Sequence, residues 1–231
     1  MRIGILKTGT APTKLAETQG DYDARMRWLL GGDGFDYVTY DVENGELPAS
    51  IDEAEGWIIT GSRHGAYEDH AWIPPLEDFI RRLAAAKRPL VGICFGHQIV
   101  AQALGGRVEK AGQGWIAGPH DYVLANGERF AANAWHQDQV IAAPPGAETM
   151  ASSQACEFAV LHYPGFGLTV QPHPEFTGEY FSGLLAEKGH VLPDDVRANA
   201  EALAETQKDD PYTVRLLRHF MRNRTVLLPA D

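Results

Sequence analysis

The sequence predicts an α/β fold: a mostly parallel sheet flanked by helices, with an antiparallel extension and a helical C-terminal segment. Strand-like and helix-like patterns alternate over the first hundred residues, which is typical of a parallel sheet with helices on its faces. Short strand-like runs separated by turn signals follow from 107 to 171, and mostly helical patterns follow residue 175. The 231 residues suit one large domain, so we expect a single domain over 1–231 whose residues 188–231 form a helical extension.

In the first half, apolar runs bounded by turn residues predict four strands: Arg2–Leu6, Asp36–Tyr40, Trp57–Thr60 and Pro89–Ile93. The last run lies between proline and glycine, as expected for a buried central strand. Between these strands, apolar residues at helical spacing predict three helices: Asp21–Leu30, Pro74–Ala86 and His97–Leu104. A proline pair opens the second helix, where proline is tolerated, and glycine pairs end the other two.

In the second half, four shorter runs predict strands: Asp121–Leu124, Glu148–Ser152, Phe158–His162 and Gly167–Gln171. Turn signals such as Asn126-Gly127 and Pro144-Pro145-Gly146 separate them, which indicates an antiparallel extension of the sheet rather than a separate domain. Three further segments are expected to be helical: Gly178–Glu187, Asp194–Thr206 and Pro211–Arg222.

The composition excludes several classes of partner. The chain has 20 basic and 31 acidic residues, a net charge of −11, so it would repel nucleic acid and anionic membrane surfaces. No apolar run reaches the ~20 residues that span a bilayer, and the N-terminus lacks the pattern of a signal peptide. With only two cysteines, a disulfide framework is not indicated. We therefore expect a cytoplasmic protein.

Cys94 is the candidate nucleophile. It lies in Gly92-Ile93-Cys94-Phe95-Gly96, where the predicted central strand gives way to a helix, as in a nucleophile elbow. The flanking glycines avoid collisions with neighbouring backbone, and the helix N-terminus favours the reactive thiolate. The alternative is a small buried apolar cysteine, since most lone cysteines are structural. Cys156 lacks such a setting and is interpreted as structural.

His173 and Glu175 are the candidate base and its orienting acid. A cysteine nucleophile needs a base within hydrogen-bond reach, and a third group must hold that base. Gln171 and His173 each precede a proline, which favours extended backbone, so His173 and Glu175 would point the same way. The alternative is a surface loop with a solvated acid. The position after an apolar strand-like run, in a chain with an elbow cysteine, favours the catalytic interpretation.

Three motifs follow one another along the chain. The elbow continues as His97-Gln98, with Ala101, Leu104, Gly105 and Gly106 behind it. Next comes Trp135-His136-Gln137-Asp138-Gln139-Val140, and last Gln171-Pro172-His173-Pro174-Glu175, with His173 lying 79 positions after Cys94. This combination, over roughly residues 1–185, resembles the class I (triad-type) glutamine amidotransferase family, in its GMP-synthase-like stand-alone branch.

The resemblance implies a flavodoxin-like α/β fold and a triad of Cys94, His173 and Glu175. Cys94 would attack the γ-carboxamide of glutamine or of a γ-glutamyl amide to form a γ-glutamyl thioester. His173 would protonate the leaving ammonia or amine and then activate water. By the same resemblance, the oxyanion-hole residues are Phe95, Gly61 and Ser62, and the substrate-binding residues are Gln98, Trp135, His136 and Gln137.

No cofactor and no metal are expected, because no Cys/His cluster has zinc-ligand spacing. His64, His70 and His120 are interpreted as surface or packing residues, and Trp72, Trp115 and Trp135 individually as core packing. The chain departs from the family at Gly61-Ser62-Arg63, where Gly-Gly-Pro is usual, and at Pro172, where an aromatic or aliphatic residue is usual. It also ends without an ATP-binding synthetase domain, so GMP synthesis by this polypeptide alone is not expected.

Three functions remain open. The first hypothesis is a stand-alone hydrolase of glutamine or of a γ-glutamyl amide or peptide. The second is a glutaminase subunit that delivers ammonia to a separate synthetase partner. The third, a non-catalytic regulatory module, is disfavoured because all three triad positions and Gln98 carry competent residues. The C-terminal helices could shape a pocket for a larger amide, form a homodimer contact or dock a partner.

Overall fold

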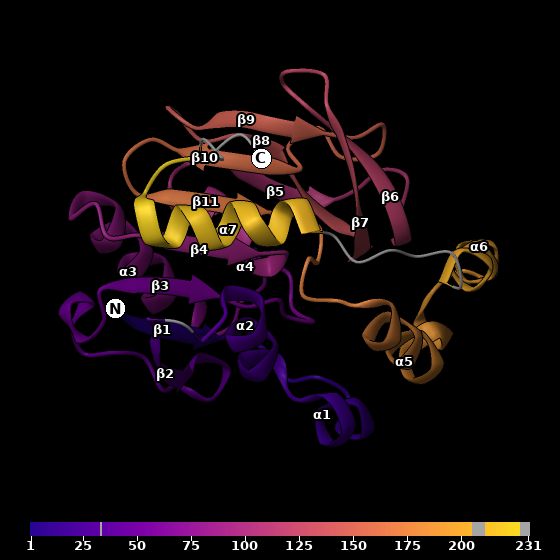
Figure 1. The fold of residues 1–231 in the computed structure, drawn as a ribbon, viewed down its shortest axis with the longest axis horizontal. Helices are drawn as coiled ribbons and strands as arrows, with labels where there is room; N and C mark the ends of the chain where they lie inside the picture. Colours follow the sequence, from indigo (N-terminus) through magenta and orange to yellow (C-terminus); the bar gives the residue numbers. More distant parts are fainter. Residues whose placement is uncertain (33, 205–210, 227–231) are drawn as a thin grey trace.

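Five parallel strands form one half of a nine-stranded sheet in this computed structural model, which describes residues 1–32, 34–204 and 211–226 (Figure 1). In spatial order they are β2 (Asp36–Asp41), β1 (Arg2–Lys7), β3 (Gly56–Ile59), β4 (Leu90–Ile93) and β11 (Gly167–Val170). Every residue of β3, β4 and β11 is buried, because helices cover both faces of this half. The predicted mostly parallel sheet is confirmed.

Four antiparallel strands extend the sheet beyond β11. They are β10 (Val160–Tyr163), β9 (Glu148–Ser152), β6 (Ile116–Leu124) and β7 (Arg129–His136). Two more strands, β5 (Arg107–Lys110) and β8 (Asp138–Ala142), pair with each other in a separate small sheet. The predicted antiparallel extension is therefore also confirmed.

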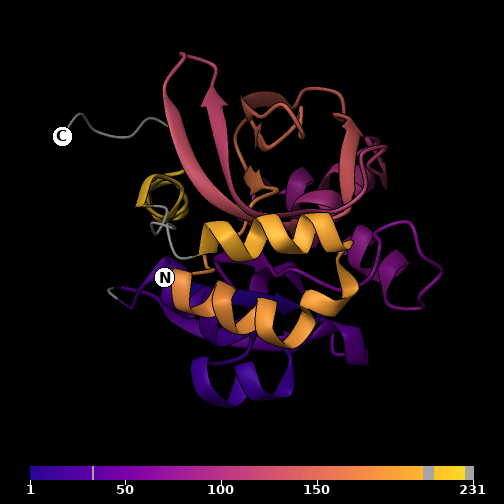
Figure 2. The ribbon, with the colours of Figure 1, turned by 90° about the vertical axis from the view of Figure 1, so that its right-hand side faces the viewer.

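Two pairs of helices cover the two faces of the parallel strands, and Figure 2 shows the yellow helix (Pro211–Asn223) and the purple helices on opposite sides. Helices α2 (Tyr22–Leu30) and α7 (Pro211–Asn223) cover one face, where Met26, Leu217 and Phe220 join a core with Ile3 and Ile58. Helices α3 (Ile73–Ala85) and α4 (Phe95–Ala103) cover the other face. Because α7 buries an apolar stripe against the sheet, the last described helix is part of the main core rather than an appendage.

A third apolar cluster lies to one side of the sheet, around α1 (Thr13–Gln19), α5 (Gly178–Lys188) and α6 (Asp194–Ala204), as Figure 1 shows. Helix α5 contacts α1 and α6, and α6 lies against β6. Three short 3₁₀ helices complete the described elements: η1 (Val42–Asn44), η2 (Ile51–Glu53) and η3 (Gly189–Val191).

The predicted elements differ from the observed ones in two ways. Most ends shift by a few residues, and α1, β5, β7 and β8 were not predicted. The end of the predicted helix Asp194–Thr206 and the last five residues of the chain lie outside the described residues. Within the described ranges, no helix combines the length and the apolar character that crossing a membrane requires.

Candidate active site

Cys94 lies in the sharp turn that joins β4 to α4. Its backbone has φ 51° and ψ −101°, a region that residues with a side chain rarely adopt. A Cβ atom on Gly92 would lie 2.6 Å from the main chain of Gly96, and one on Gly96 would lie 2.4 Å from the carbonyl oxygen of Ile59. Both glycines are therefore required by close backbone approach, as the predicted elbow implies. The turn places the Cys94 thiol at the N-terminus of α4.

His173 and Glu175 follow the neighbouring strand. Strand β11 pairs with β4 in parallel, with Val170 opposite Ile93, so the chain leaves both strands at the same edge of the sheet. His173 Nδ1 lies 2.7 Å from Glu175 Oε1, and the two side chains are 5% and 2% exposed. The predicted pair therefore forms, and it is buried rather than in a solvated loop.

The charges of the site act strongly on His173. Burial lowers the pKa of its imidazole, but the Glu175 carboxylate and the Cys94 sulfur outweigh that effect and raise the pKa to about 10. The Nε2 atom of His173 is buried and makes no hydrogen bond to the described residues. Gly61 packs between the two groups, because a Cβ atom there would lie 3.3 Å from His173 Cε1 and 4.0 Å from Cys94 Cβ. The carboxylate and the sulfur thus favour the protonated imidazole.

Aromatic and arginine side chains that the sequence analysis did not single out support this pair. Phe176 stacks on the His173 ring at 4.0 Å between centroids and 6° between planes, and Tyr180 stacks on Phe176. The Arg25 guanidinium lies over the Tyr180 ring, and its Nε donates to the Glu175 carbonyl oxygen at 3.1 Å. The sequence offers a signal for Phe176, which directly follows the His173–Glu175 motif. It offers none for Arg25, which lies 150 positions from Glu175.

Asn133, on β7, was also missed. Its carbonyl oxygen accepts the His173 backbone N–H at 2.8 Å, and its side-chain Nδ2 donates to the Phe176 carbonyl at 2.8 Å. Both ends of the segment from His173 to Phe176 are therefore fixed to the antiparallel part of the sheet.

Two glutamines connect Cys94 to strand β8. Gln171 Nε2 lies 3.6 Å from Cys94 Sγ and donates to it. Gln171 Oε1 accepts from Gln98 Nε2 at 3.2 Å, and Gln98 Nε2 also donates to the Asp138 carbonyl at 2.8 Å. Both N–H groups of the Gln98 amide are thereby used inside the protein, which leaves its Oε1 as the atom able to meet a ligand. Gln171 belongs to the last of the three sequence motifs, but its contact with Cys94 was not predicted.

The predicted oxyanion residues lie at the same edge. As the first residue of α4, Phe95 has a backbone N–H that no carbonyl of that helix can accept. The hydroxyls of Thr60 and Thr8 lie 3.0 and 3.2 Å from the Gly61 carbonyl oxygen. In a planar trans peptide the N–H of the next residue points the opposite way. The Ser62 N–H is thus turned away from the two threonines.

The three remaining predicted residues, His136, Trp135 and Gln137, differ in their surroundings. His136 Nδ1 donates to the Asp138 carbonyl at 3.2 Å, while its Nε2 is buried without a partner. Burial and the nearby His173 lower the pKa of His136 to about 3, so the ring is neutral and Nε2 is a bare acceptor. The Trp135 ring instead packs with Trp115 and Phe181 in the third apolar cluster. Gln137 is half-buried in the turn between β7 and β8.

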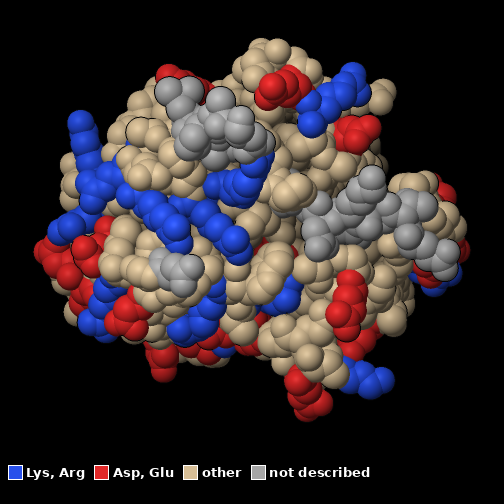
Figure 3. All heavy atoms as spheres, viewed as in Figure 1, with Lys and Arg blue, Asp and Glu red and all other residues tan. Residues whose placement is uncertain are grey.

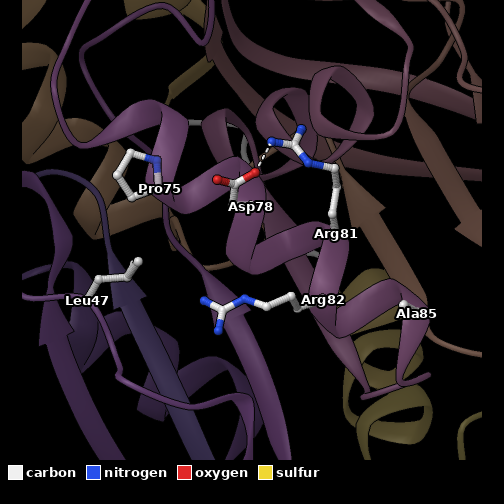
Figure 4. A pocket seen from close by; sticks show the side chains of 6 residues that line it. All are labelled: Leu47, Pro75, Asp78, Arg81, Arg82 and Ala85. Atoms are coloured by element: carbon white, nitrogen blue, oxygen red, sulfur yellow. Dashed lines mark hydrogen bonds and ion pairs between the residues drawn. The ribbon is translucent and has the colours of Figure 1, made fainter.

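Cys156 is buried, and this burial raises the pKa of its thiol to about 12, in keeping with a structural role. A surface hollow of about 580 Å³ lies along α3 (Figure 4), where Asp78 pairs with Arg81. Its lining residues are Leu47, Pro75, Asp78, Arg81, Arg82 and Ala85. None of them belongs to the candidate site.

Several known proteins resemble this chain in sequence. The family model "Glutamine amidotransferase class-I" matches residues 38–189. Gamma-glutamyl peptidase 4 of Arabidopsis thaliana is 28% identical, with 97% of each chain covered. A GMP synthase (glutamine-hydrolyzing) of Thermus thermophilus is 40% identical, over 51% of this chain and 24% of its own length.

Solved structures share the fold. A glutamine amidotransferase from Thermotoga maritima superimposes with a TM-score of 0.76 at 18% identity, covering 97% of both chains. A second, from Methylobacillus flagellatus, gives a TM-score of 0.70 at 19% identity, covering 88% of this chain and 90% of its own. The flavodoxin-like arrangement expected from the resemblance is confirmed. Since the family model spans most of the chain, the protein belongs to the class-I glutamine amidotransferase family.

Proposed function

We propose that this protein is a stand-alone, cysteine-dependent amide hydrolase that cleaves the γ-carboxamide of glutamine or of a γ-glutamyl amide or peptide. The observation that carries the proposal is the buried His173–Glu175 pair, 2.7 Å apart, at the same sheet edge as the strained Cys94 turn. A buried nucleophile, base and orienting acid in this order are the parts that acyl transfer requires.

In the first half of the reaction, the Cys94 thiolate attacks the carboxamide carbon and a C–S bond forms. The tetrahedral oxyanion accepts hydrogen bonds from the backbone N–H of Phe95 and of Ser62, which are oriented before the reaction. The C–N bond then breaks, and the His173 imidazolium transfers its Nε2 proton to the departing nitrogen. Ammonia or an amine leaves, and the γ-glutamyl group remains on sulfur as a thioester.

In the second half, water replaces the amine. The neutral His173 removes a proton from water, the oxygen attacks the thioester carbon, and the C–S bond breaks to release glutamate. Glu175 stabilises the imidazolium that forms and fixes its orientation. Gln171 donates to Cys94 Sγ and so favours the anionic sulfur in both halves.

The polar groups left unpaired in the site indicate how the amino-acid end is held. The Gln98 Oε1 and the His136 Nε2 are acceptors, and both suit the α-ammonium group of a γ-glutamyl substrate. The Trp135 ring packs with α5, so in our proposal it forms the wall of the pocket rather than a polar contact. Gln137 completes that side.

The extent of the relatives favours a stand-alone enzyme. The plant gamma-glutamyl peptidase and this chain cover 97% of each other, whereas the GMP synthase match covers only 24% of that enzyme. The same GMP synthase match, at 40% identity, keeps a second candidate: a glutaminase subunit that passes ammonia to a synthetase partner.

The test is kcat/KM of the purified chain alone on glutamine, on a panel of γ-glutamyl peptides and amides, and on butyramide. We expect at least one substituted γ-glutamyl amide to exceed glutamine by about a hundredfold, and butyramide to be ~10⁴-fold poorer because the site's polar groups stay unpaired. Activity that requires a second protein would establish the glutaminase subunit instead. Equal rates on butyramide would show a general amidase.

Matched cysteine variants test the nucleophile. Cys94→Ser should abolish turnover, since a hydroxyl is a far poorer nucleophile with this base. Cys156→Ser should keep it, because that thiol is buried away from the reacting groups. Near-normal activity of Cys94→Ser, or preferential labelling of Cys156 by a glutamine-like diazoketone, contradicts the mechanism.

A further inference from the structure

The loop that follows Ser62 brings two histidines and a glutamate together. His64 Nδ1 lies 3.2 Å from Glu68 Oε2, and His70 Nε2 lies 2.7 Å from the same oxygen. One ligand atom from each of the three residues can be chosen so that all lie within 4.8 Å of one another. The side chains are 18%, 42% and 33% exposed, so an ion from solvent can reach them.

This set of atoms suits a transition metal. Two imidazole nitrogens and one carboxylate oxygen are ligands that Zn²⁺ and related divalent ions prefer, with water in the remaining position. Bonds of about 2.0–2.1 Å to a tetrahedral ion place ligand atoms about 3.3 Å apart. The separation of 3.2 Å between His64 Nδ1 and Glu68 Oε2 is already close to that value. The separation of 2.7 Å between His70 Nε2 and the same oxygen must lengthen, which a small side-chain movement allows.

A second carboxylate fixes the His64 ring in the orientation of a ligand. His64 Nε2 lies 3.1 Å from Glu43 Oε1, which Arg63 Nη2 also contacts at 3.1 Å. When Nε2 donates its proton to Glu43, rather than accepting from Arg63 Nε at 3.3 Å, the lone pair of Nδ1 faces the Glu68 oxygen. Metal-bound histidines are held in this way, by a carboxylate on the nitrogen that does not bind the ion. Two acceptors facing each other need a cation between them, either a proton or a metal ion.

The His70 ring is also held in place. It stacks on Trp72 with an angle of 11° and a centroid distance of 5.9 Å, while His64 and His70 lie 4.2 Å apart edge to face. The position of a ligand is therefore set by packing as well as by hydrogen bonds, as a preorganised site requires.

We propose that His64, Glu68 and His70 form a binding site for a divalent transition-metal ion, with Glu43 as the carboxylate that orients His64. From the sequence alone, His64 and His70 are interpreted as surface or packing residues, because no zinc-motif spacing is present. The conformation of the loop, and not a motif in the sequence, brings the two side chains together.

The site adjoins the reaction centre without entering it. The His64 backbone N–H donates to Ser62 Oγ at 3.1 Å, and the Trp72 ring lies 5.5 Å from that of Phe95. Ser62 and Phe95 carry the two proposed oxyanion donors. An ion bound to this loop would restrain it directly beside those donors, and the role we assign to the ion is structural rather than catalytic.

Cobalt(II) is the probe, titrated into the purified full chain and followed by its visible d–d absorbance, with Zn²⁺ added afterwards to displace it. We expect one Co²⁺ to bind without the near-ultraviolet band of thiolate ligation, since no cysteine is in the site. His64→Ala with His70→Ala should abolish the absorbance. Glu43→Gln, which removes only the orienting carboxylate, should weaken affinity by about 10–100-fold.

The matched control is His162→Ala. His162 Nδ1 also lies close to a carboxylate, Glu148 at 2.9 Å, but lacks a second imidazole, so its loss should leave Co²⁺ affinity unchanged. The wild-type protein binding no Co²⁺ overturns the proposal. Undiminished binding by the double variant, or a thiolate band that places the ion at Cys94, overturns it as well.

Discussion

The contact between His173 and Glu175 converts an imidazole that burial would neutralise into one that stays protonated. Without the carboxylate and the neighbouring sulfur, a fully enclosed histidine resembles His97 or His136, whose pKa burial lowers to about 3. With them, the pKa of His173 rises to about 10. In the proposed mechanism, the proton for the leaving nitrogen is therefore available across the physiological range.

The pH profile of Glu175→Gln tests this assignment. In the unmodified enzyme, kcat/KM should fall on the alkaline side near pH 10, as the imidazolium is lost. Removing the carboxylate lowers the pKa of His173, so that limb should move to lower pH. The rate of Glu175→Gln should also fall, by as much as ~10⁴-fold. This loss should be smaller than the loss in His173→Ala. If the alkaline limb of the pH profile did not move, Glu175 would have no effect on the pKa of His173.

At the residue scale, short motifs predicted the candidate triad but not its surroundings. The neighbouring residues in the sequence indicate the proposed chemical roles of Cys94, His173 and Glu175. Arg25 and Asn133 act through main-chain carbonyls of distant segments, so nothing in their own sequence context indicates the contact. His64 and His70 belong to the same class, since only the loop geometry joins them.

At the scale of the elements, the turn between β4 and α4 depends on close contacts between the main chains of β3, β4 and α4. Glycines at the contact points make these contacts possible. Strand β4 approaches α4 at Gly92, and α4 approaches β3 at Gly96. That contact presses the N-terminus of the helix onto the sheet and keeps Cys94 at positive φ.

Gly96→Ala should therefore lower the free energy of unfolding, because its Cβ would lie 2.4 Å from the Ile59 carbonyl oxygen. Overpacking of this kind costs about 1–3 kcal/mol. The matched control is Gly112→Ala, where no atom lies within 4 Å and the change should stay within about 0.5 kcal/mol. Urea unfolding of both variants provides the measurement. Equal midpoints would show that the turn relaxes freely.

Elements with strong periodicity were predictable, and those created by pairing were not. Strand β4 and helix α3 carry continuous or helically spaced apolar residues, and both were found close to their predicted positions. Strand β7 reads Arg-Phe-Ala-Ala-Asn-Ala-Trp-His, which has little intrinsic preference for a strand. Its eight residues are extended because β6 pairs with all of them.

At the scale of the whole molecule, the net negative charge does not describe every part of the surface. On the face shown in Figure 3, lysine and arginine side chains gather toward one half, although the net charge is −11. Arg218 of α7 has an internal role: it donates to the carbonyls of Leu29 and Trp28, and these hydrogen bonds join α7 to α2. Net charge thus governs long-range repulsion and not the charge of each surface patch.

The parallel pairing of β4 with β11 also determines when activity can appear. The two strands are neighbours in the sheet, yet β5 to β10 all lie between them in the chain. Closing so long a loop costs entropy that is recovered only when β11 inserts, which makes this a late step of folding. The return of catalytic activity should therefore report the completion of folding. After dilution from denaturant, turnover should return with the slowest refolding phase of tryptophan fluorescence. Activity that preceded that phase would mean that the two strands associate early, before the intervening antiparallel strands are in place.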